Sequence, residues 1–359
     1  MAYSALVFDR VRMEQTPPKP RISLHDIARR LNVSQPTVSR ALKDDPRISI
    51  ATRERVQRVA REMGYQPDPM LTALAHYRRG KTQTPVSSAL AWINRWTKPE
   101  QLRRHQEFEL YWKGATQEAE RCGYRLEEFV CDERLPLPRL EKILLTRNIR
   151  GILIPPHLSC PDWGDFDWAQ FCVVRFGHSI DTPRAHLVTS DQLTDSLMAF
   201  QHILKMGYRR IGFVAADQPH IRFKAGYLFA QLTLDLKQRL PLLDLTDPNS
   251  EEGKRRLASW LKQVQPDAIL TDVAPLRDML SKLRWRVPED VGLAALSVLD
   301  GNADAGIYQN SAEIGRAAVQ LVISLIHHNE RGVPEVCREL LVEGQWVDGQ
   351  TLPTRNGKR

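Results

Sequence analysis

Three short sets of apolar residues recur at helical spacing once the chain has passed residue 20. They are Leu24, Ile27, Ala28 and Leu31; Val38, Ala41 and Leu42; and Val56, Val59, Ala60 and Met63. A serine precedes each set (Ser23, Ser34 and Ser49), where its side-chain oxygen can cap a helix. Helices this short are not stable alone. The pattern therefore predicts three helices around one small core, the first two joined by the tight turn of a helix-turn-helix.

The pattern changes after residue 86, where apolar, strand-like runs alternate with helical segments. The runs cover residues 87–94, 151–156, 171–177, 210–216, 267–272 and 291–299. The helical segments are Phe108–Cys122, Leu193–Met206, Ile221–Leu236, Glu251–Val264 and Ser311–His327. Such alternation predicts parallel sheets with helices on both faces, and the segment is long enough for two lobes. The predicted fold class is α/β: a small all-α headpiece followed by a two-lobed α/β core.

Charge separates the two parts of the chain further. Residues 1–80 contain 15 Lys and Arg against 8 Asp and Glu, which is +7 of the net charge of +8. A basic end on a nearly neutral body indicates a polyanion as the partner of that end. Charge by itself does not distinguish DNA from RNA or an anionic membrane.

Several other classes of protein find little support in the sequence. No apolar run reaches the roughly 20 residues of a membrane span, and the first 20 residues do not form a signal peptide. We expect residues 1–20 to be a disordered leader, with Met13 as an alternative start. The five cysteines form no C-x-x-C pair, so we expect reduced thiols, no metal site and no cofactor.

The second predicted helix has an outer face without a role in any core. When Val38 and Ala41 point inward, Gln35 and Arg40 point outward. A DNA major groove admits a helix, where Arg can bond guanine and Gln can bond adenine. A solvated helical bundle with an incidental basic face is the alternative.

The stretch "ISLHDIARRLNVSQPTVSRALKDDPRISIATRERVQRVAREMGYQPD" resembles the DNA-binding headpiece of the LacI/GalR family of bacterial transcription regulators. The D-[IV]-A, N-V-S-x-x-T-V-S-R and T-R-x-R-V elements match in order and spacing. The resemblance implies base reading by Gln35, Pro36 and Arg40 of operator DNA. It also implies phosphate contacts by Ser23, Ser34, Thr37, Ser39 and Arg53, and it places Leu24 among the DNA-binding residues.

The same resemblance extends to residues 67–85 and the body of the chain. It implies a hinge helix that inserts Leu74 into the minor groove, although Asp68 and Pro69 depart from the common pattern of that segment. "LKMGYRRIGFV", "WRVPEDVGLAAL" and "LLVEGQWVDG" resemble the family's periplasmic-binding-protein-like core. The implied domains are a headpiece at 21–66, a hinge and linker at 67–85, an effector-binding and dimerisation core at 86–350, and a tail at 351–359.

The sequence matches the family's usual effector-site residues less well than its DNA-binding residues. Phe223, flanked by Arg222 and Lys224, stands where the family usually has arginine, and Ser297 stands where it has aspartate. We expect a small effector, a sugar, in the cleft between the lobes. The expected contacts are Arg222, Phe223, Asp272, Ser297, Asp300 and Gln309, with Trp92 as an aromatic platform.

These features predict a cytoplasmic, nucleoid-associated homodimer that represses transcription from palindromic DNA and does not bind membranes. A regulator controlled by a partner protein and a sugar-binding protein remain alternatives. An enzyme is not expected, because no H-E-x-x-H, G-x-S-x-G or Walker motif occurs. "DWGDFDW" at 162–168 holds three aspartates, which we interpret as a capped surface turn.

Overall fold

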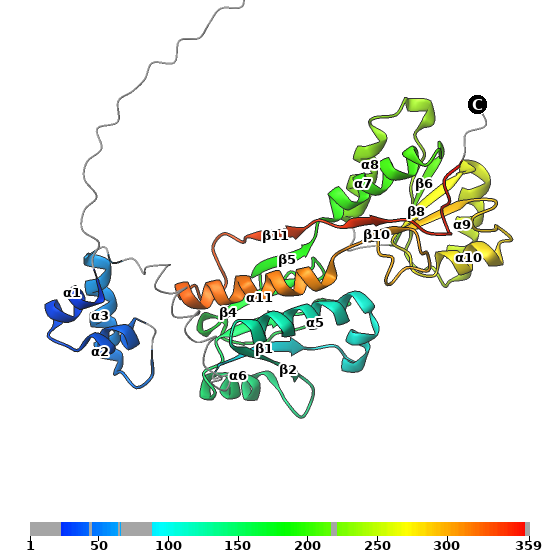
Figure 1. The fold of residues 1–359 in the computed structure, drawn as a ribbon. Coiled ribbons are helices and arrows are strands. Elements are labelled where there is room, and N and C mark those ends of the chain that lie inside the picture. The colour runs from blue at the N-terminus through cyan, green and yellow to red at the C-terminus, as the bar shows by residue number, and fades with distance from the viewer. Residues whose placement is uncertain (1–22, 43–44, 64, 66–87, 217–220, 356–359) are drawn as a thin grey trace, which may run out of the picture. The chain divides into compact units, whose positions relative to one another are not determined.

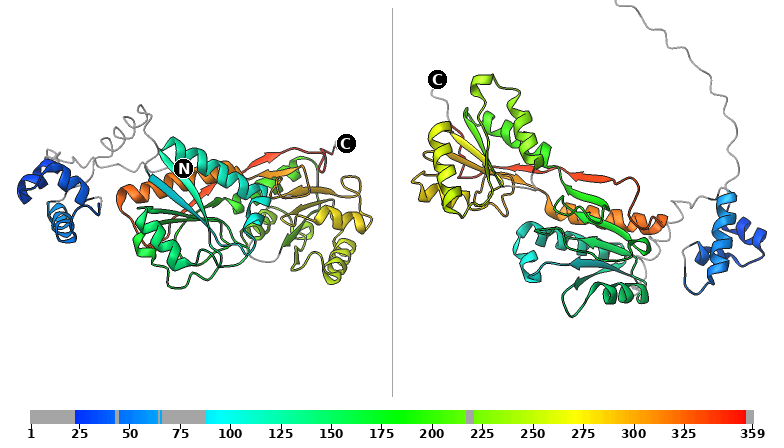
Figure 2. Two further views of the ribbon diagram at one scale, coloured as in Figure 1. Left: turned by 90° about the horizontal axis from the view of Figure 1, so that it is seen from below. Right: turned by 180° about the vertical axis from the view of Figure 1, so that it is seen from behind.

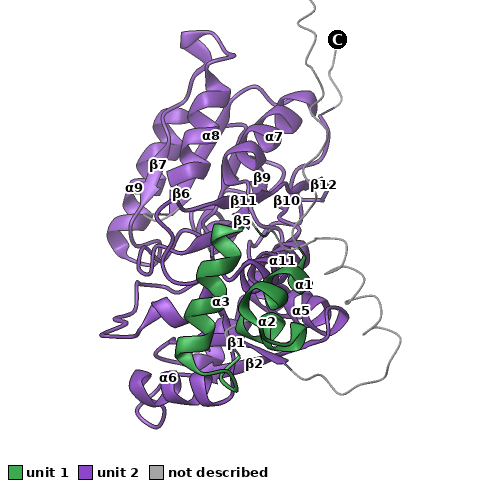
Figure 3. Ribbon diagram, turned by 90° about the vertical axis from the view of Figure 1, so that its left-hand side faces the viewer, with its two compact units in different colours: residues 1–82 green, residues 83–359 purple. Residues whose placement is uncertain are grey.

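The computed structural model describes residues 23–42, 45–63, 65, 88–216 and 221–355. The chain forms two compact units, residues 1–82 and 83–359, shown in separate colours in Figure 3. The predicted leader, the predicted hinge and Leu74 lie outside the described residues. Each unit is described by itself.

The first unit contains the three predicted helices, α1 (Leu24–Leu31), α2 (Gln35–Ala41) and α3 (Ile50–Glu62). Ser23, Ser34 and Ser49 each accept a hydrogen bond from the backbone N–H three residues on, so all three predicted caps are confirmed. The apolar sets of the three helices form one small core. Between α1 and α2, Asn32 adopts a left-handed conformation (φ 51°), which turns the chain within two residues.

The second unit has two lobes, each built on a six-stranded sheet (Figure 1). In the first lobe the strand order is β11-β5-β4-β3-β1-β2, and all neighbours are parallel. The strands are β1 (Ser88–Asn94), β2 (Tyr124–Val130), β3 (Gly151–Ile154), β4 (Cys172–Phe176), β5 (His186–Ser190) and β11 (Glu339–Val342). The helical segments are η1 (Pro99–Arg104), α5 (Gln106–Arg121), α6 (Leu137–Thr146), η2 (Trp168–Gln170) and α11 (Ser311–His328).

In the second lobe the strand order is β12-β10-β9-β8-β6-β7, with only β12 antiparallel to its neighbour. The strands are β6 (Ile211–Ala216), β7 (Leu243–Leu245), β8 (Ala268–Thr271), β9 (Gly292–Ala295), β10 (Gly306–Tyr308) and β12 (Gln345–Val347). The helical segments are α7 (Gln192–Lys205), α8 (Ile221–Gln231), η3 (Leu236–Gln238), α9 (Glu251–Val264) and α10 (Leu276–Lys282).

Each sheet has a core on both faces, which explains why central strands such as β3, β4 and β9 are buried along their whole length. In β1, Leu90 and Trp92 face the core under α5 and α11, whereas Ala91 and Ile93 face the core under α6. In the second lobe, α7 and α8 cover one face and α9 and α10 the other. The two views of Figure 2 show both layers of helices. The predicted fold class is confirmed by this architecture.

The chain passes between the lobes three times, and these passages position the cleft. They join β5 to α7, β10 to α11, and β11 to β12. Asn310 and Gly344 lie on two of the passages. The Asn310 amide donates to the Glu343 carbonyl, and the Gly344 N–H donates to the buried carboxyl of Asp195, both at 2.8 Å.

The structure changes two bounds of the prediction and adds detail to one turn. Helix α8 ends at Gln231 rather than 236, and a short 3-10 turn follows. "DWGDFDW" is a turn capped by its aspartates, as expected; Asp162, Asp165 and Asp167 are exposed, while Trp163 and Phe166 anchor it in the first lobe. The core also extends past residue 350, because Leu352 is fully buried in the second lobe.

Candidate DNA-reading helix and effector cleft

The start of α2 is fixed by local hydrogen bonds. The Ser34 side chain accepts from the Thr37 N–H at 3.3 Å and lies 2.8 Å from the Thr37 hydroxyl. Pro36 follows in the first turn, where its missing N–H costs nothing. These contacts fix the helix without using Gln35 or Arg40.

The two faces of α2 differ sharply in burial. Val38 and Ala41 are 0% exposed and belong to the headpiece core. Gln35, Pro36 and Arg40 are exposed on the other face. Within the described residues the Arg40 guanidinium forms no hydrogen bond or ion pair. This arrangement leaves a planar, charged donor free for a ligand such as a guanine edge.

The other predicted DNA contacts occupy different environments. Ser23 is exposed, and its hydroxyl is 2.6 Å from the Asp26 carboxylate in a reciprocal cap. Leu24 packs against the headpiece core. Thr37, Ser39 and Arg53 are half-buried, with Arg53 in the first turn of α3.

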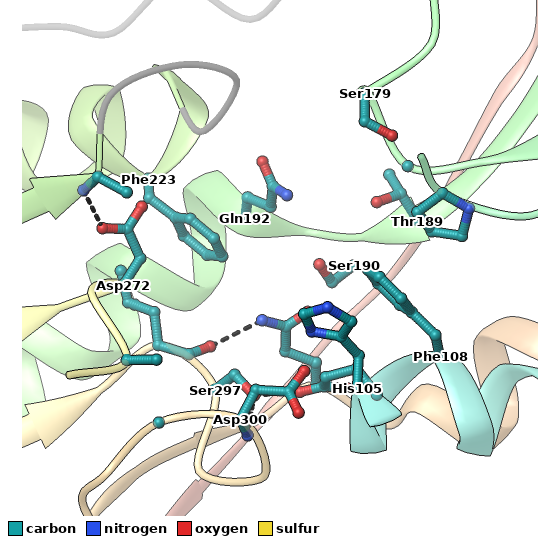
Figure 4. Close-up of a pocket in the computed structure, with 18 of the residues that line it drawn as sticks. His105, Phe108, Ser179, Thr189, Ser190, Gln192, Phe223, Asp272, Ser297 and Asp300 are labelled. Carbon is teal, nitrogen blue, oxygen red and sulfur yellow. Dashed lines mark hydrogen bonds between the residues drawn. The ribbon is translucent and has the colours of Figure 1, made fainter. Parts of the chain in front are cut away.

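The second unit contains a cavity of about 450 Å³ between its two lobes (Figure 4). Residues that follow strand ends form most of its walls: Pro156 and His157 after β3, Gly177 and His178 after β4, Thr271 and Asp272 at the end of β8, and Ser297 after β9. Helices α5 and α8 complete it with Phe108 and Phe223. A crevice at the carboxyl ends of parallel strands is where α/β folds bind ligands, and this volume suits a small molecule.

The structure brings most of the predicted effector residues together. Phe223, Asp272, Ser297, Asp300 and Gln309 all line the cavity. Asp272 accepts a hydrogen bond from the Ala216 N–H at 2.7 Å, and the Gln309 amide donates to the Leu296 carbonyl at 2.8 Å (Figure 4). Both side chains are thereby held in place beside the cavity.

Trp92 and Arg222 do not belong to this set, and both predictions need correction. Trp92 is 1% exposed inside the first lobe, 5.4 Å from the ring of Trp112, so it offers no face to a ligand. Arg222 is not among the residues of the cavity wall; its guanidinium pairs with Glu339 at 3.8 Å.

The two lobes touch at one edge of the cavity through buried polar groups. The Glu107 carboxyl on α5 accepts hydrogen bonds from the hydroxyls of Ser297 and Ser311. One residue earlier, the Gln106 N–H donates to Asp300 at 2.8 Å. Burial raises the pKa of Glu107 to about 7, and the nearby charges of Asp300 and Asp195 act in the same direction.

Two histidines of the cavity wall are held neutral. Burial lowers the pKa of His157 and of His178 to about 4. The His157 ring accepts the Arg95 N–H at 3.1 Å through Nε2, and its Nδ1 lies 2.8 Å from the Pro155 carbonyl. The Nε2 of His178 is buried and has no hydrogen-bond partner among the residues that the structure describes.

Several wall residues were not predicted from the sequence: His105, Glu107, Phe108, Tyr111, His157, His178 and Gln192. A signal existed for two of them, because His157 and His178 follow directly on apolar runs that were predicted as parallel strands. No local pattern marks the α5 residues, which reach the cavity only because α5 begins at the lobe boundary.

The rest of the described chain adds three observations. No described helix is long and apolar enough to cross a membrane. Across the described ranges, no three His, Cys, Asp or Glu side chains are grouped as metal ligands would be. None of the five cysteines is in a disulfide.

A helix-turn-helix headpiece followed by a two-lobed α/β core, with a cavity of small-molecule size, is the architecture of a DNA-binding regulator. Comparisons with known proteins agree. The model of the bacterial regulatory proteins of the lacI family matches residues 23–68, and that of the periplasmic binding protein-like domain matches residues 200–352. The chain thus carries a DNA-binding domain of the lacI family and a periplasmic-binding-protein-like domain, and the curated proteins that it resembles are transcriptional regulators rather than enzymes.

Three similar proteins illustrate this kinship. The HTH-type transcriptional repressor MelR of Bacillus subtilis (strain 168) is 24% identical, with 88% of this chain and 93% of MelR covered. The transcriptional regulator CelR–cellobiose complex has a TM-score of 0.55 at 20% identity, covering 92% of this chain and 100% of that one. The lac repressor dimer bound to operator and the anti-inducer ONPF has a TM-score of 0.52 at 16% identity, covering 93% and 100%.

Proposed function

We propose that this protein is a transcriptional repressor that binds a palindromic operator as a homodimer and responds to a sugar in its cleft. The observation that carries the proposal is the two-sided helix α2, with Val38 and Ala41 in the core and Gln35, Pro36 and Arg40 exposed. A helix presented in this way fits a major groove. Such a protein acts in the cytoplasm, at the nucleoid.

In this proposal the exposed face of α2 has distinct tasks. Arg40 bonds guanine O6 and N7, Gln35 bonds a neighbouring base edge, and Pro36 supplies only apolar contact. Ser23, Leu24, Ser34, Thr37, Ser39 and Arg53 adjoin the phosphate backbone, where contacts position the headpiece but do not read sequence. For Leu74, insertion into a minor-groove step stays a prediction from the sequence.

Dimerisation and effector control draw support from the relatives. The lac repressor structure is a dimer on its operator, and the CelR structure holds cellobiose. Two half-sites related by a two-fold axis require two headpieces. We propose that dimerisation runs through the core, because a headpiece of three short helices buries too little surface.

The experiment is selection of binding sites from a random DNA pool, followed by titration at fixed salt. Arg40→Ala should weaken binding to the selected site by about 1–3 kcal/mol and relax the preference at one base pair in each half-site. Arg61→Ala is the matched control, because it removes the same charge from the exposed last turn of α3. If Arg40→Ala selects the same site with undiminished affinity, α2 is not the reading helix.

A further inference from the structure

The charged residues that the structure describes in the cleft wall all have the same sign. Among the described residues that line it, the charged ones are Glu107, Asp272 and Asp300, and none is Lys or Arg. Building on the sugar effector proposed above, we infer that the effector carries no phosphate or carboxylate: the cleft takes an uncharged, hydroxyl-rich molecule and rejects its anionic derivatives.

The nearest cations on α8 are directed to other partners. Arg222 and Lys224 flank Phe223, yet Arg222 pairs with Glu339 on β11 and Lys224 pairs with Asp244 on β7. Phe223 alone of the three lines the cavity. The residue of this stretch of α8 that lines the cavity is therefore an apolar ring, not a guanidinium that could bind an anion.

Helix N-termini are the other common source of positive potential, and those of α5 and α7 are among the ones at this cleft. At the start of α5, the Gln106 N–H is bound by the carboxylate of Asp300 at 2.8 Å. At the start of α7, the Thr194 N–H is bound by the carboxylate of Asp191 at 3.1 Å. Both helix ends are already neutralised by the protein itself.

Two of the three histidines of the wall add no positive charge to this balance. His157 and His178 have a pKa of about 4 because they are buried, so they are neutral at pH 7. The free, buried Nε2 of His178 is a neutral hydrogen-bonding atom, well suited to a ligand hydroxyl. Gln192, Thr189 and Ser190 add further neutral polar groups to the same wall.

The energetic consequence follows from desolvation. An anion entering the cavity loses its water and meets no Lys or Arg among the described lining residues, and the carboxylates of Asp272 and Asp300 repel it at short range. A hydroxyl exchanges one set of neutral hydrogen bonds for another. Phe108 and Phe223 come from opposite lobes and offer apolar contact to the C–H groups of such a molecule (Figure 4).

The experiment divides a bacterial metabolite extract on an anion-exchange resin at pH 7.5. The retained fraction holds phosphorylated and carboxylated compounds, and the flow-through holds uncharged and cationic ones. The melting temperature of the full-length protein is measured with each fraction at equal osmolarity. The flow-through should raise it by about 2–4 °C, as ligand at about ten times its Kd would, and the retained fraction should leave it unchanged.

Variants sharpen the assignment. Phe223→Arg and Asp272→Asn each change the charge at the cavity by one, so each should gain a response to the retained fraction. Arg222→Ala removes a cation from outside the cavity and should respond as the wild type does. A lost response in Arg222→Ala would place Arg222 in the site and contradict the inference.

The possible failures are distinct. Stabilisation of the wild type by the retained fraction alone overturns the charge selectivity while leaving a small effector in place. The cationic compounds of the flow-through can be separated on a cation-exchange resin. If they stabilise the protein, the inference that the effector is uncharged is overturned. No stabilisation by either fraction overturns both this inference and effector control, whereas the reading of DNA by α2 is judged separately by the selection experiment.

Discussion

The headpiece and the cleft differ in how far apart along the sequence the residues lie that stabilise each of them. In the headpiece, the N-cap of each of the three helices joins residues three positions apart, as between Ser34 and Thr37. In the cleft, Glu107 meets Ser311 and Gln106 meets Asp300, about 200 residues further along the chain. The DNA-reading surface is thus a local structure, whereas the ligand site exists only when both lobes are folded. Changes in one region should leave the other intact.

The largest expected effect comes from the headpiece core. Val38→Asp places an unpaired carboxylate at a fully buried position, at a cost that matches or exceeds the few kcal/mol that stabilise so small a unit. Hydrogen exchange should show complete loss of protection in α1–α3, with unchanged protection in residues 88–355, and operator binding should vanish.

Ser39→Asp is the matched control for folding, because it adds the same charge at the next, half-buried position. Its headpiece should keep native protection. Protection retained by Val38→Asp, or protection lost from the core, would contradict the separation of the two regions.

A second prediction concerns the lobe boundary. Since the pKa of Glu107 rises from 4.5 to about 7 on folding, the folded protein binds its proton more tightly than the unfolded chain. Its contribution to stability is therefore complete below about pH 4.5 and is lost as the pH rises through 7. At pH 8 the free energy of unfolding of Glu107→Gln, measured in urea, should exceed that of the wild type by on the order of 2–3 kcal/mol. At pH 5 the difference should be small.

Asp195 is a second buried carboxyl whose pKa is raised to about 7, so Glu107→Gln should remove only part of the pH dependence. Adding Asp195→Asn should flatten it further. If the free energy of unfolding depended on pH equally in the wild type and both variants, neither carboxyl would titrate near pH 7 in the folded protein.

The smallest effect tests a single cap. Ser34→Ala removes the oxygen that binds the Thr37 N–H and should destabilise the headpiece by about 1 kcal/mol. Hydrogen exchange of α2 measures it. Ser49→Ala, at the equivalent cap of α3, should cost a similar amount, and neither change should alter exchange in the core. An effect on the lobes would break the proposed independence.

The same difference in range explains what the sequence predicts. The caps of α1–α3, the faces of α2 and the bounds of α9 are local patterns of spacing, and they were predicted correctly. Short strands such as β7 and β12 carry three residues each and give no periodic signal. Trp92 looked like a ligand platform because the sequence cannot show that α5 and α11 cover it. The wall residues of α5 were missed for a related reason, since their position depends on how two distant lobes meet.

The central claim is that these two differently built regions act on each other. The most direct test is the affinity of the full-length protein for its selected operator, measured at fixed salt with and without the stabilising flow-through fraction. Coupled sites change each other's affinity, typically by about 5–150-fold. We predict a change of at least about 5-fold, absent when the fraction is replaced by the retained anions. Equal operator affinity with and without a fraction that raises the melting temperature would contradict ligand control of DNA binding.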